Sequence, residues 1–290
     1  RKLLLTIVFS AISIFSFSQQ NAYYQQSAKY KMDIAIDAQN FTYQGNQTLT
    51  YINNSPDELK VVYFHLYWNA FKPNSMMDQR VQSQGKNGDS RLQTNGVSRL
   101  ASIPKEEEGA QNIHWIKQNG KDLKFEIQET IMKVELNTPI KPNSSTTFTM
   151  EWDAVIPQQI RRSGRNNREG IDMSMTQWYP KIAEYDYDGW ATFDYIGREF
   201  HAPFADFEVN IKIDKDYIIG AGGTLENPLE VRGYDQNADI KSDSKNKATW
   251  KWTAKNILDF AFAADRDYTV ESFTILDGPK IYYVYQKSEK

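Results

Sequence analysis

The sequence contains no cysteine and only three histidines, and both shortages narrow its chemistry. Without cysteine the chain has no disulfide, no thiolate metal ligand and no cysteine nucleophile. The histidines are His65, His114 and His201, and none belongs to an H-E-x-x-H pair. No metal site is therefore expected within this chain. His65 lies in the apolar run YFHLYW and is expected to be a hydrogen-bonded residue of the core or of a sheet face.

Several catalytic signatures are missing as well. The sequence has no G-x-S-x-G, no P-loop and no G-x-G-x-x-G, and GAGG at 220–223 leads into TLENP, which is more typical of a tight turn between strands. The formal net charge is -3, so the sequence shows no overall excess of positive charge, and nucleic acid is not expected as a partner. The residues alone therefore reveal no catalytic centre.

Only the amino terminus carries a long hydrophobic run. Two basic residues precede LLLTIVFSAISIF, and Ser16 and Ser18 follow at the -3 and -1 positions of a cleavage site. This pattern predicts a signal peptide over residues 1–18, a mature chain from Gln19, and a secreted or periplasmic location. The run is shorter than the roughly 20 residues that a spanning helix needs, so no membrane span is expected.

The remaining sequence is rich in strand-like runs. Aromatic residues make up 13% of the chain, which suits pleated, half-buried surfaces. YKMDIAID at 30–37 alternates apolar and polar side chains, and similar runs follow it, separated by Asn, Asp, Pro and Gly. No helix of convincing length and amphipathic period follows the signal peptide. These features predict an all-β fold, an antiparallel sandwich or a saddle-like assembly of sheets.

Three segments interrupt the strand pattern. Residues 72–112 are polar and predict a short helix or an excursion over one face of the molecule. The run RRSGRNNREG at 161–170 is expected to be a solvated, mobile loop, and the alternative is an arginine clamp for an anion or a carboxylate. The third is QWYPKIAEYDYDGW at 177–190, which fits the period of neither a helix nor a strand.

The acidic residues of this third segment raise the question of catalysis. Glu184, Asp186 and Asp188 are spaced two residues apart, and two of them could form a glycosidase pair. Acidic side chains beside a glycine are more often turn formers and backbone acceptors. We therefore expect structural roles for these acids.

Three stretches together resemble a known family. They are the opening strands from YKMDIAID to HLYWNAF, then MTQWYPKIAEYDYDGW with REFHAPFADFEVNIKID, and finally LDFAFAADRDYTVESFTILDGPKIYYVY. In their order and spacing they are similar to the amino-terminal domain of zinc metallo-aminopeptidases of the aminopeptidase N and leukotriene hydrolase type, particularly secreted bacterial members. The resemblance covers residues 29–285.

The resemblance implies a multi-stranded β-saddle domain over residues 19–275 that caps a thermolysin-like catalytic domain. Residues 276–290 would be the start of that catalytic domain, so the chain is expected to be truncated before it. In the family, the catalytic domain holds zinc through H-E-x-x-H and a distant Glu. The resemblance therefore implies zinc in the intact enzyme, a peptide substrate, and no catalytic residue or metal ligand in this chain.

The resemblance also implies two substrate-binding residues, Gln177 and Tyr179. In the family, a Glu or Gln of a Thr-Gln-x-Glu/Gln segment helps to bind the α-amino group of the substrate. Tyr179 stands at that position here, and it can accept a hydrogen bond or offer its ring face to a cation. Gln177 or Glu184 could take over the role that the missing carboxylate or amide has in the family.

The alternative function belongs to another class. A secreted, non-catalytic β-sandwich module could bind carbohydrate or a protein partner through exposed aromatic side chains, with Trp178 and Trp190 as the residues to test. Against it stands the ordinary role of such side chains in the core of a sheet protein.

Overall fold

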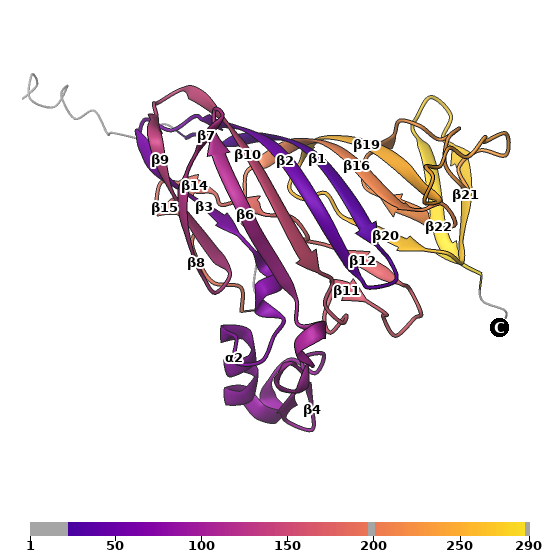
Figure 1. The fold of residues 1–290 in the computed structure, drawn as a ribbon, viewed down its shortest axis with the longest axis horizontal. Helices are drawn as coiled ribbons and strands as arrows, with labels where there is room; N and C mark the ends of the chain where they lie inside the picture. The colour runs from indigo at the N-terminus through magenta and orange to yellow at the C-terminus, as the bar shows by residue number, and fades with distance from the viewer. Residues whose placement is uncertain (1–22, 197–200, 288–290) are drawn as a thin grey trace, which may run out of the picture.

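The computed structural model describes residues 23–196 and 201–287. The signal peptide predicted over residues 1–18 lies outside the described residues. Strands dominate, and the all-β prediction is confirmed (Figure 1). The boundary predicted after residue 275 falls in the turn between the last two strands, β21 (Tyr268–Thr274) and β22 (Lys280–Gln286).

The largest element is an eight-stranded sheet, which runs across the length of the molecule in Figure 1. Its strands lie in the order β18 (Thr224–Leu225), β19 (Lys247–Ile257), β16 (Phe204–Asp214), β1 (Ser27–Asp37), β2 (Thr42–Asn53), β10 (Ser144–Val155), β6 (Ala110–Gln118) and β7 (Lys121–Asp122). Neighbours pair antiparallel with one exception: β1 and β16 are parallel, with Ser27 opposite Phe204. The prediction of antiparallel sheets thus holds except at this central pair.

Two four-stranded sheets accompany the large one. One has the order β11 (Gly164–Arg165), β12 (Met173–Met175), β20 (Phe262–Asp265) and β17 (Ile218–Ala221); the other has β13 (Lys181–Ile182), β3 (Leu59–His65), β9 (Ile131–Ile140) and β8 (Lys124–Gln128). Two-stranded pairs are formed by β4 (Gln93–Thr94) with β5 (Val97–Ser98), by β14 (Tyr185–Asp186) with β15 (Gly189–Trp190), and by β21 with β22.

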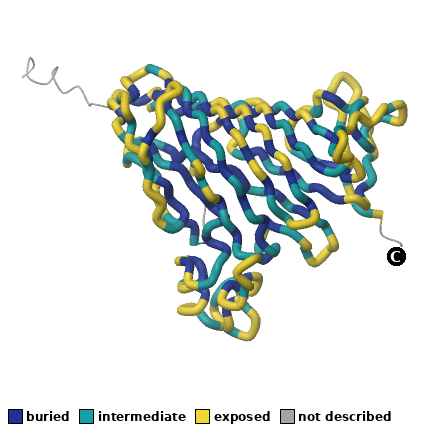
Figure 2. The backbone as a smooth tube through the Cα atoms, in the orientation of Figure 1, coloured by how far each residue is buried: buried dark blue, intermediate teal, exposed yellow. Residues whose placement is uncertain are grey.

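The core lies between the large sheet and the smaller ones. Alternate residues of β1, such as Met32 and Ile34, are buried while their neighbours are exposed, as the alternating colours along the strands of Figure 2 show. Contacts between layers include the edge-on packing of Phe148 from β10 against Phe64 from β3, with ring centroids 6.1 Å apart. The period of two read from the sequence therefore decides which face of each strand is buried.

The polar segment 72–112 forms an excursion that projects from the sheets (Figure 1). It contains α2 (Met76–Gln84), the β4–β5 pair, and short 3-10 turns η3 (Gly85–Asn87), η4 (Leu100–Ser102) and η5 (Lys105–Glu107), and it follows the turn η2 (Tyr67–Ala70). Ser75 caps α2 by accepting a hydrogen bond from the Asp78 amide at 3.2 Å. The predicted short helix is present, but the segment projects away from the sheets instead of lying over one face, and residues 110–112 belong to β6 of the large sheet.

The arginine-rich run 161–170 attaches this excursion to the sheets. Arg161 lies 3.5 Å from Asp89 and Arg165 lies 3.5 Å from Glu107, and the two arginine side chains are only 11% and 12% exposed. Arg165 also covers the ring of Phe41 at 4.9 Å. The prediction of a solvated, mobile loop is therefore wrong for these two arginines, because acids from the excursion pair with them.

Within the described part of the chain, no helix is both long and apolar enough to cross a bilayer.

Candidate functional site

Residues 176–183, the first half of the irregular segment, lie in the core. Trp178 and Tyr179 are both fully buried. The Trp178 carbonyl accepts hydrogen bonds from the hydroxyl of Tyr43 and from the side-chain amide of Gln111, the latter at 2.8 Å. The Pro180 carbonyl accepts one from the Gln47 amide at 3.2 Å. The backbone at 178–180 is therefore bonded to side chains of the large sheet, whereas Lys181 and Ile182 pair with β3 as strand β13.

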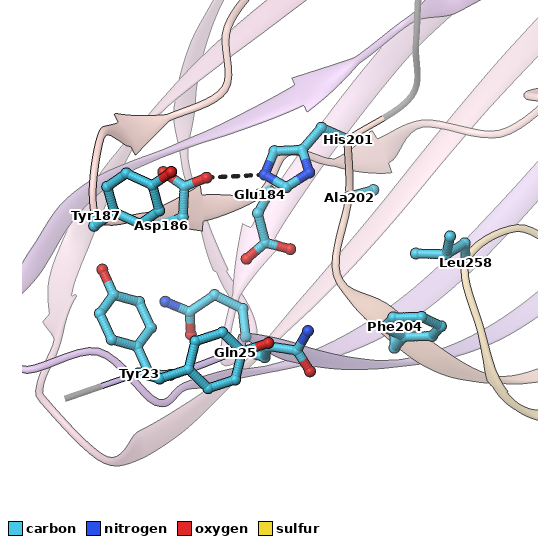
Figure 3. Close-up of a pocket in the computed structure, with 11 residues that line it drawn as sticks. Tyr23, Gln25, Glu184, Asp186, Tyr187, His201, Ala202, Phe204 and Leu258 are labelled. Atoms are coloured by element: carbon cyan, nitrogen blue, oxygen red, sulfur yellow. Dashed lines mark hydrogen bonds and ion pairs between the residues drawn. The ribbon is translucent and has the colours of Figure 1, made fainter.

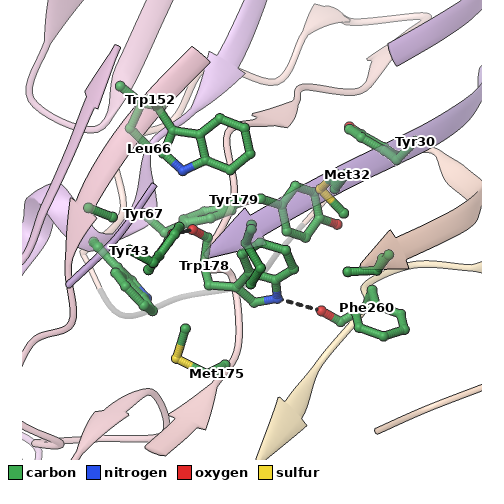
Figure 4. Packing of buried hydrophobic residues seen from close by; sticks show 14 of the residues in the cluster. Tyr30, Met32, Tyr43, Leu66, Tyr67, Trp152, Met175, Trp178, Tyr179 and Phe260 are labelled. Atoms are coloured by element: carbon green, nitrogen blue, oxygen red, sulfur yellow. Dashed lines mark hydrogen bonds between the residues drawn. The ribbon is translucent and has the colours of Figure 1, made fainter. Parts of the chain in front are cut away.

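Trp178 connects the layers at this point (Figure 4). Its indole Nε1 donates to the Phe260 carbonyl at 2.9 Å. Its ring packs edge-on against Tyr43, Tyr179 and Phe262, with centroids 5.1 to 6.0 Å apart. Trp178 is thus a core residue, and it offers no surface to a carbohydrate.

Tyr179 belongs to a buried polar group of three side chains. Its hydroxyl donates to Asp259 Oδ1 at 3.0 Å, and Lys181 Nζ lies 3.5 Å from the same oxygen. Lys181 also donates to the Leu258 carbonyl at 2.5 Å. Burial lowers the pKa of Lys181 while Asp259 opposes that effect, and burial raises the pKa of Tyr179 well above its usual value.

Gln177 is also buried, with 4% of its surface exposed, and its φ of 55° lies in the left-handed region. Its side chain makes no hydrogen bond to any residue that the structure describes. The two predicted substrate-binding residues therefore lie beneath the surface of this chain, two positions apart, and only Tyr179 has a polar partner there.

The second half of the segment, residues 184–190, turns outward. Tyr185 and Trp190 pair across the β14–β15 ladder, and the Tyr185 hydroxyl donates to Asp57 at 2.7 Å. Trp190 is half-buried against the rings of Tyr51 and Tyr63. Asp186 Oδ1 accepts from the Asp188 amide at 2.8 Å, which is the turn-forming role expected of these acids.

A cavity of about 480 Å³ opens beside this hairpin. Its walls come from three parts of the chain: Tyr23 to Gln26 before β1, the hairpin residues Glu184, Asp186 and Tyr187, and a group formed by His201, Ala202, Phe204 and Leu258. Figure 3 shows the Glu184 carboxylate in the middle of these residues, between His201 and Gln25. Neither Gln177 nor Tyr179 lines this cavity.

Glu184 has the most perturbed carboxyl group of the cavity. Its residue is 7% exposed, and burial raises the pKa of its carboxyl to about 7. His201 and the backbone amides of Tyr185 and Gln26 lower this pKa, and Asp186 raises it. Near neutral pH the group therefore exchanges a proton easily, which is a property of many binding and catalytic sites.

Histidines play two different parts here. His201, for which the sequence indicates no special role, lies at the cavity rim with Nε2 2.9 Å from Asp186 Oδ2. His65 is 5% exposed and stacks on Tyr67 at 4.9 Å, as expected of a core residue, and burial lowers its pKa to about 4. No group of three or more His, Asp or Glu residues in the described ranges could hold a metal ion.

Glu184 and Asp186 stand out in the sequence as acids of one segment, for which structural roles are predicted, but no pattern connects them with the other walls of the cavity. His201 is separated from Asp186 by 15 positions, and Tyr23 and Tyr24 precede the first strand. Nothing in the local pattern of these residues links them. Only the fold, which places the start of β16 beside the start of β1, brings them together.

Comparisons with known proteins bear on the fold. No protein-family model and no curated protein matches the sequence. The solved structure of a mutant M1 zinc metallopeptidase from Deinococcus radiodurans, bound to a Tyr-Ser-Ala substrate, superposes with a TM-score of 0.51 at 10% identity, covering 91% of this chain and 48% of that one. A two-domain M1 zinc metallopeptidase mutant bound to L-arginine gives 0.50, with the same identity and coverage.

This likeness shows a common fold over nearly all of the chain. The chain spans about half the length of these metallopeptidases, 48% in both cases.

Proposed function

We propose that this chain is the amino-terminal capping and substrate-binding domain of a zinc-dependent aminopeptidase that hydrolyses amino-terminal residues from peptides. The observation that carries the proposal is the fold shared with M1 zinc metallopeptidases over 91% of this chain but 48% of theirs. The ordered resemblance of three sequence segments to the same class of enzyme supports it independently.

The proposal assigns the chemistry to a catalytic domain that follows this chain. Zinc and the H-E-x-x-H motif would belong to that domain, which would be the direct partner of this one. The described residues would supply shape and substrate contacts. We propose Gln177 and Tyr179 as substrate contacts: the Gln177 amide has no partner among the described residues, and the Tyr179 hydroxyl is held by Asp259.

We extend the proposal to export. The basic start, the short apolar run and the small residues at Ser16 and Ser18 support a secreted or periplasmic enzyme. Amino-terminal sequencing of the protein purified from its own cells would test this. A mature chain that begins at Gln19 is expected, and retention of residues 1–18 would contradict it.

The deciding experiment uses the full reading frame. We expect its product to contain H-E-x-x-H with a downstream Glu, to release the chromophore from an aminoacyl-4-nitroanilide, and to lose that activity to a chelator and regain it with zinc. The 290-residue chain alone should be inactive with or without zinc. A full-length protein without the motif, or turnover by this chain alone, would refute the proposal.

The structure favours no second function. The alternative binding module needed Trp178 and Trp190 on the surface, but Trp178 is fully buried and Trp190 is packed against other rings.

A further inference from the structure

We propose that the cavity beside the β14–β15 hairpin binds a short saccharide. The sugar rings would stack on Tyr23 and Tyr187, and the sugar hydroxyls would form hydrogen bonds with Glu184 and Gln25. This site adds to the proposed peptidase function and does not depend on it, because residues of this chain form the cavity. It is also separate from the two tryptophans considered above. Three features carry the inference: exposed aromatic rings, polar groups with unused bonding capacity, and a carboxyl group whose protonation suits a neutral ligand.

Two tyrosines from separate segments line the cavity. Tyr23, which precedes β1, is 84% exposed, and Tyr187, in the turn of the hairpin, is 79% exposed. Side chains of this size are usually largely buried, so two of them at one cavity indicate a surface that a ligand covers. The C–H groups on the face of a pyranose carry partial positive charge and are attracted to the negative face of an aromatic ring. Phe204 and Leu258, 39% and 45% exposed, extend this apolar wall.

Glu184 is the first polar group of the site, and Figure 3 shows its carboxyl group among the lining side chains. The residue is 7% exposed. The backbone amides of Tyr185 and Gln26 and the nearby His201 support its ionised form, and no side chain in the described ranges donates a hydrogen bond to it. Because a carboxylate accepts several hydrogen bonds, Glu184 retains capacity for the hydroxyl of a ligand.

Gln25 is the second polar group. Its backbone carbonyl accepts a hydrogen bond from Asn54 Nδ2 at 2.7 Å, but its side-chain amide has no partner among residues 23–196 and 201–287. An amide both donates and accepts, as a hydroxyl does. Asp186 is already engaged, because Oδ2 lies 2.9 Å from His201 Nε2 and Oδ1 accepts from the Asp188 amide. The cavity therefore offers one carboxyl group and one amide to a ligand.

The protonation of Glu184 favours a neutral ligand. Burial raises the pKa of its carboxyl to about 7, so both forms are present near neutral pH. The other titratable groups around this carboxyl are Asp186, His201, Tyr24 and Tyr51. The protonated carboxyl donates a hydrogen bond, whereas the ionised one only accepts. A hydroxyl pairs with either form, but a cation requires the ionised form and an anion is repelled by it.

The size of the cavity and the mixture of its walls also fit a sugar. Its volume of about 480 Å³ lies within the usual range for small-ligand sites. A saccharide presents C–H faces to apolar walls and hydroxyls to polar groups at the same time. A phenylalanine side chain would fill the apolar part but would leave Glu184 and Gln25 without a hydroxyl. A phenylalanine derivative is therefore the competing ligand in the test.

The test is a titration of the purified full-length protein with four sugars: cellobiose, maltose, lactose and N,N′-diacetylchitobiose. Saturation-transfer difference nuclear magnetic resonance measures the affinity of each. We expect at least one of them to bind saturably. Its affinity should change by less than about threefold between about pH 6 and pH 8, because a hydroxyl pairs with both forms of Glu184. Absence of saturable binding by all four sugars would overturn the inference.

Substitutions at the cavity locate the bound sugar. Tyr23→Ala and Tyr187→Ala should each weaken binding about two- to tenfold, as expected when one aromatic contact is lost. Glu184→Ala should weaken it at least about tenfold, whereas Glu184→Gln should stay within about threefold of wild type, because an amide still donates and accepts. The matched control Tyr283→Ala removes a tyrosine of β22 that is 53% exposed but lies outside the cavity, and it should leave binding unchanged.

Three further results contradict the inference. They are wild-type affinity in both Tyr23→Ala and Tyr187→Ala, wild-type affinity in Glu184→Ala, and tighter binding of N-acetylphenylalaninamide than of every sugar at this cavity. Circular dichroism confirms that each variant is folded, and the two exposed tyrosines carry the test if Glu184→Ala does not fold. Peptidase activity is measured separately and without sugar, so failure of this inference and failure of the proposed function give different results.

Discussion

The two halves of the segment 176–190 both carry aromatic side chains but lie in opposite environments. In residues 176–183, Trp178 and Tyr179 are fully buried and the polar groups are bonded to neighbouring layers. In residues 184–190, Tyr187 is 79% exposed and Glu184 faces a cavity. The difference comes from the surroundings of each half. The large sheet and residues 258–260 enclose the first half, while the second forms the β14–β15 hairpin and contacts the rest of the chain through Tyr185 and Trp190.

The comparison predicts the largest effect for an aromatic truncation in the first half. Trp178→Ala should lower the free energy of unfolding by about 3 to 5 kcal/mol, because it removes a buried ring and leaves a cavity. The matched change in the second half, Tyr187→Ala, should stay within about 0.5 kcal/mol. Urea denaturation, monitored by circular dichroism, measures both unfolding free energies. Similar decreases for the two variants would contradict the difference between the two halves.

The next largest effect concerns the buried pair. Asp259→Asn should cost about 3 kcal/mol, because it leaves the Lys181 ammonium without a counter-ion. Lys181→Met should lower the free energy of unfolding by less. The Asp259 side chain is 25% exposed, against 3% for Lys181, and in this variant Asp259 still accepts the hydrogen bond from the Tyr179 hydroxyl. Denaturant unfolding of the two variants measures this difference in unfolding free energy. An equal cost for both would mean that water reaches Lys181.

A smaller effect depends on pH. Because burial raises the Glu184 pKa from 4.5 to about 7, the folded chain binds more protons than the unfolded chain between these values. Stability from this group is therefore present at low pH and is lost as the pH rises through this range. Wild type should lose about 2 kcal/mol more than Glu184→Gln on going from acidic to neutral conditions, a value reduced because the cavity admits water. Parallel curves for the two proteins would contradict a raised pKa.

The smallest effect on stability is expected at Gln177. Asparagine tolerates a positive φ better than most residues, so Gln177→Asn should change the unfolding free energy by no more than about 0.5 kcal/mol. In the full-length protein the same substitution should raise KM for an aminoacyl-4-nitroanilide if Gln177 contacts substrate. An unchanged KM with unchanged stability would remove Gln177 from the proposed site.

The sequence predicted what depends on local pattern. Alternation in 30–37 correctly placed Met32 and Ile34 in the core, and the polar character of 72–112 indicated the excursion. The strand β6 was missed because its polar Gln and Asn residues at 111–112 belong to the same polar stretch. Local patterns could separate elements but could not determine their neighbours.

Long-range pairing explains what remained hidden. The arginines of 161–170 look solvated until Asp89 and Glu107 are brought to them from the excursion. Tyr179 looks available to a ligand until Asp259, 80 positions later, accepts the hydrogen bond of its hydroxyl. The candidate cavity likewise combines residues from before β1, from the β14–β15 hairpin and from the start of β16. Each of these contacts depends on topology, which the residue types alone do not determine.

The parallel pairing of β1 with β16 has a consequence for biogenesis. β1 can form a hairpin with β2 as soon as both are made, but its other edge stays open until Phe204 and the residues after it arrive. Pairings between such distant segments form slowly, and an open strand edge can recruit other chains. A growing chain would therefore carry an open strand edge from the time β1 is made until β16 is made, and during this interval it is most in need of a chaperone.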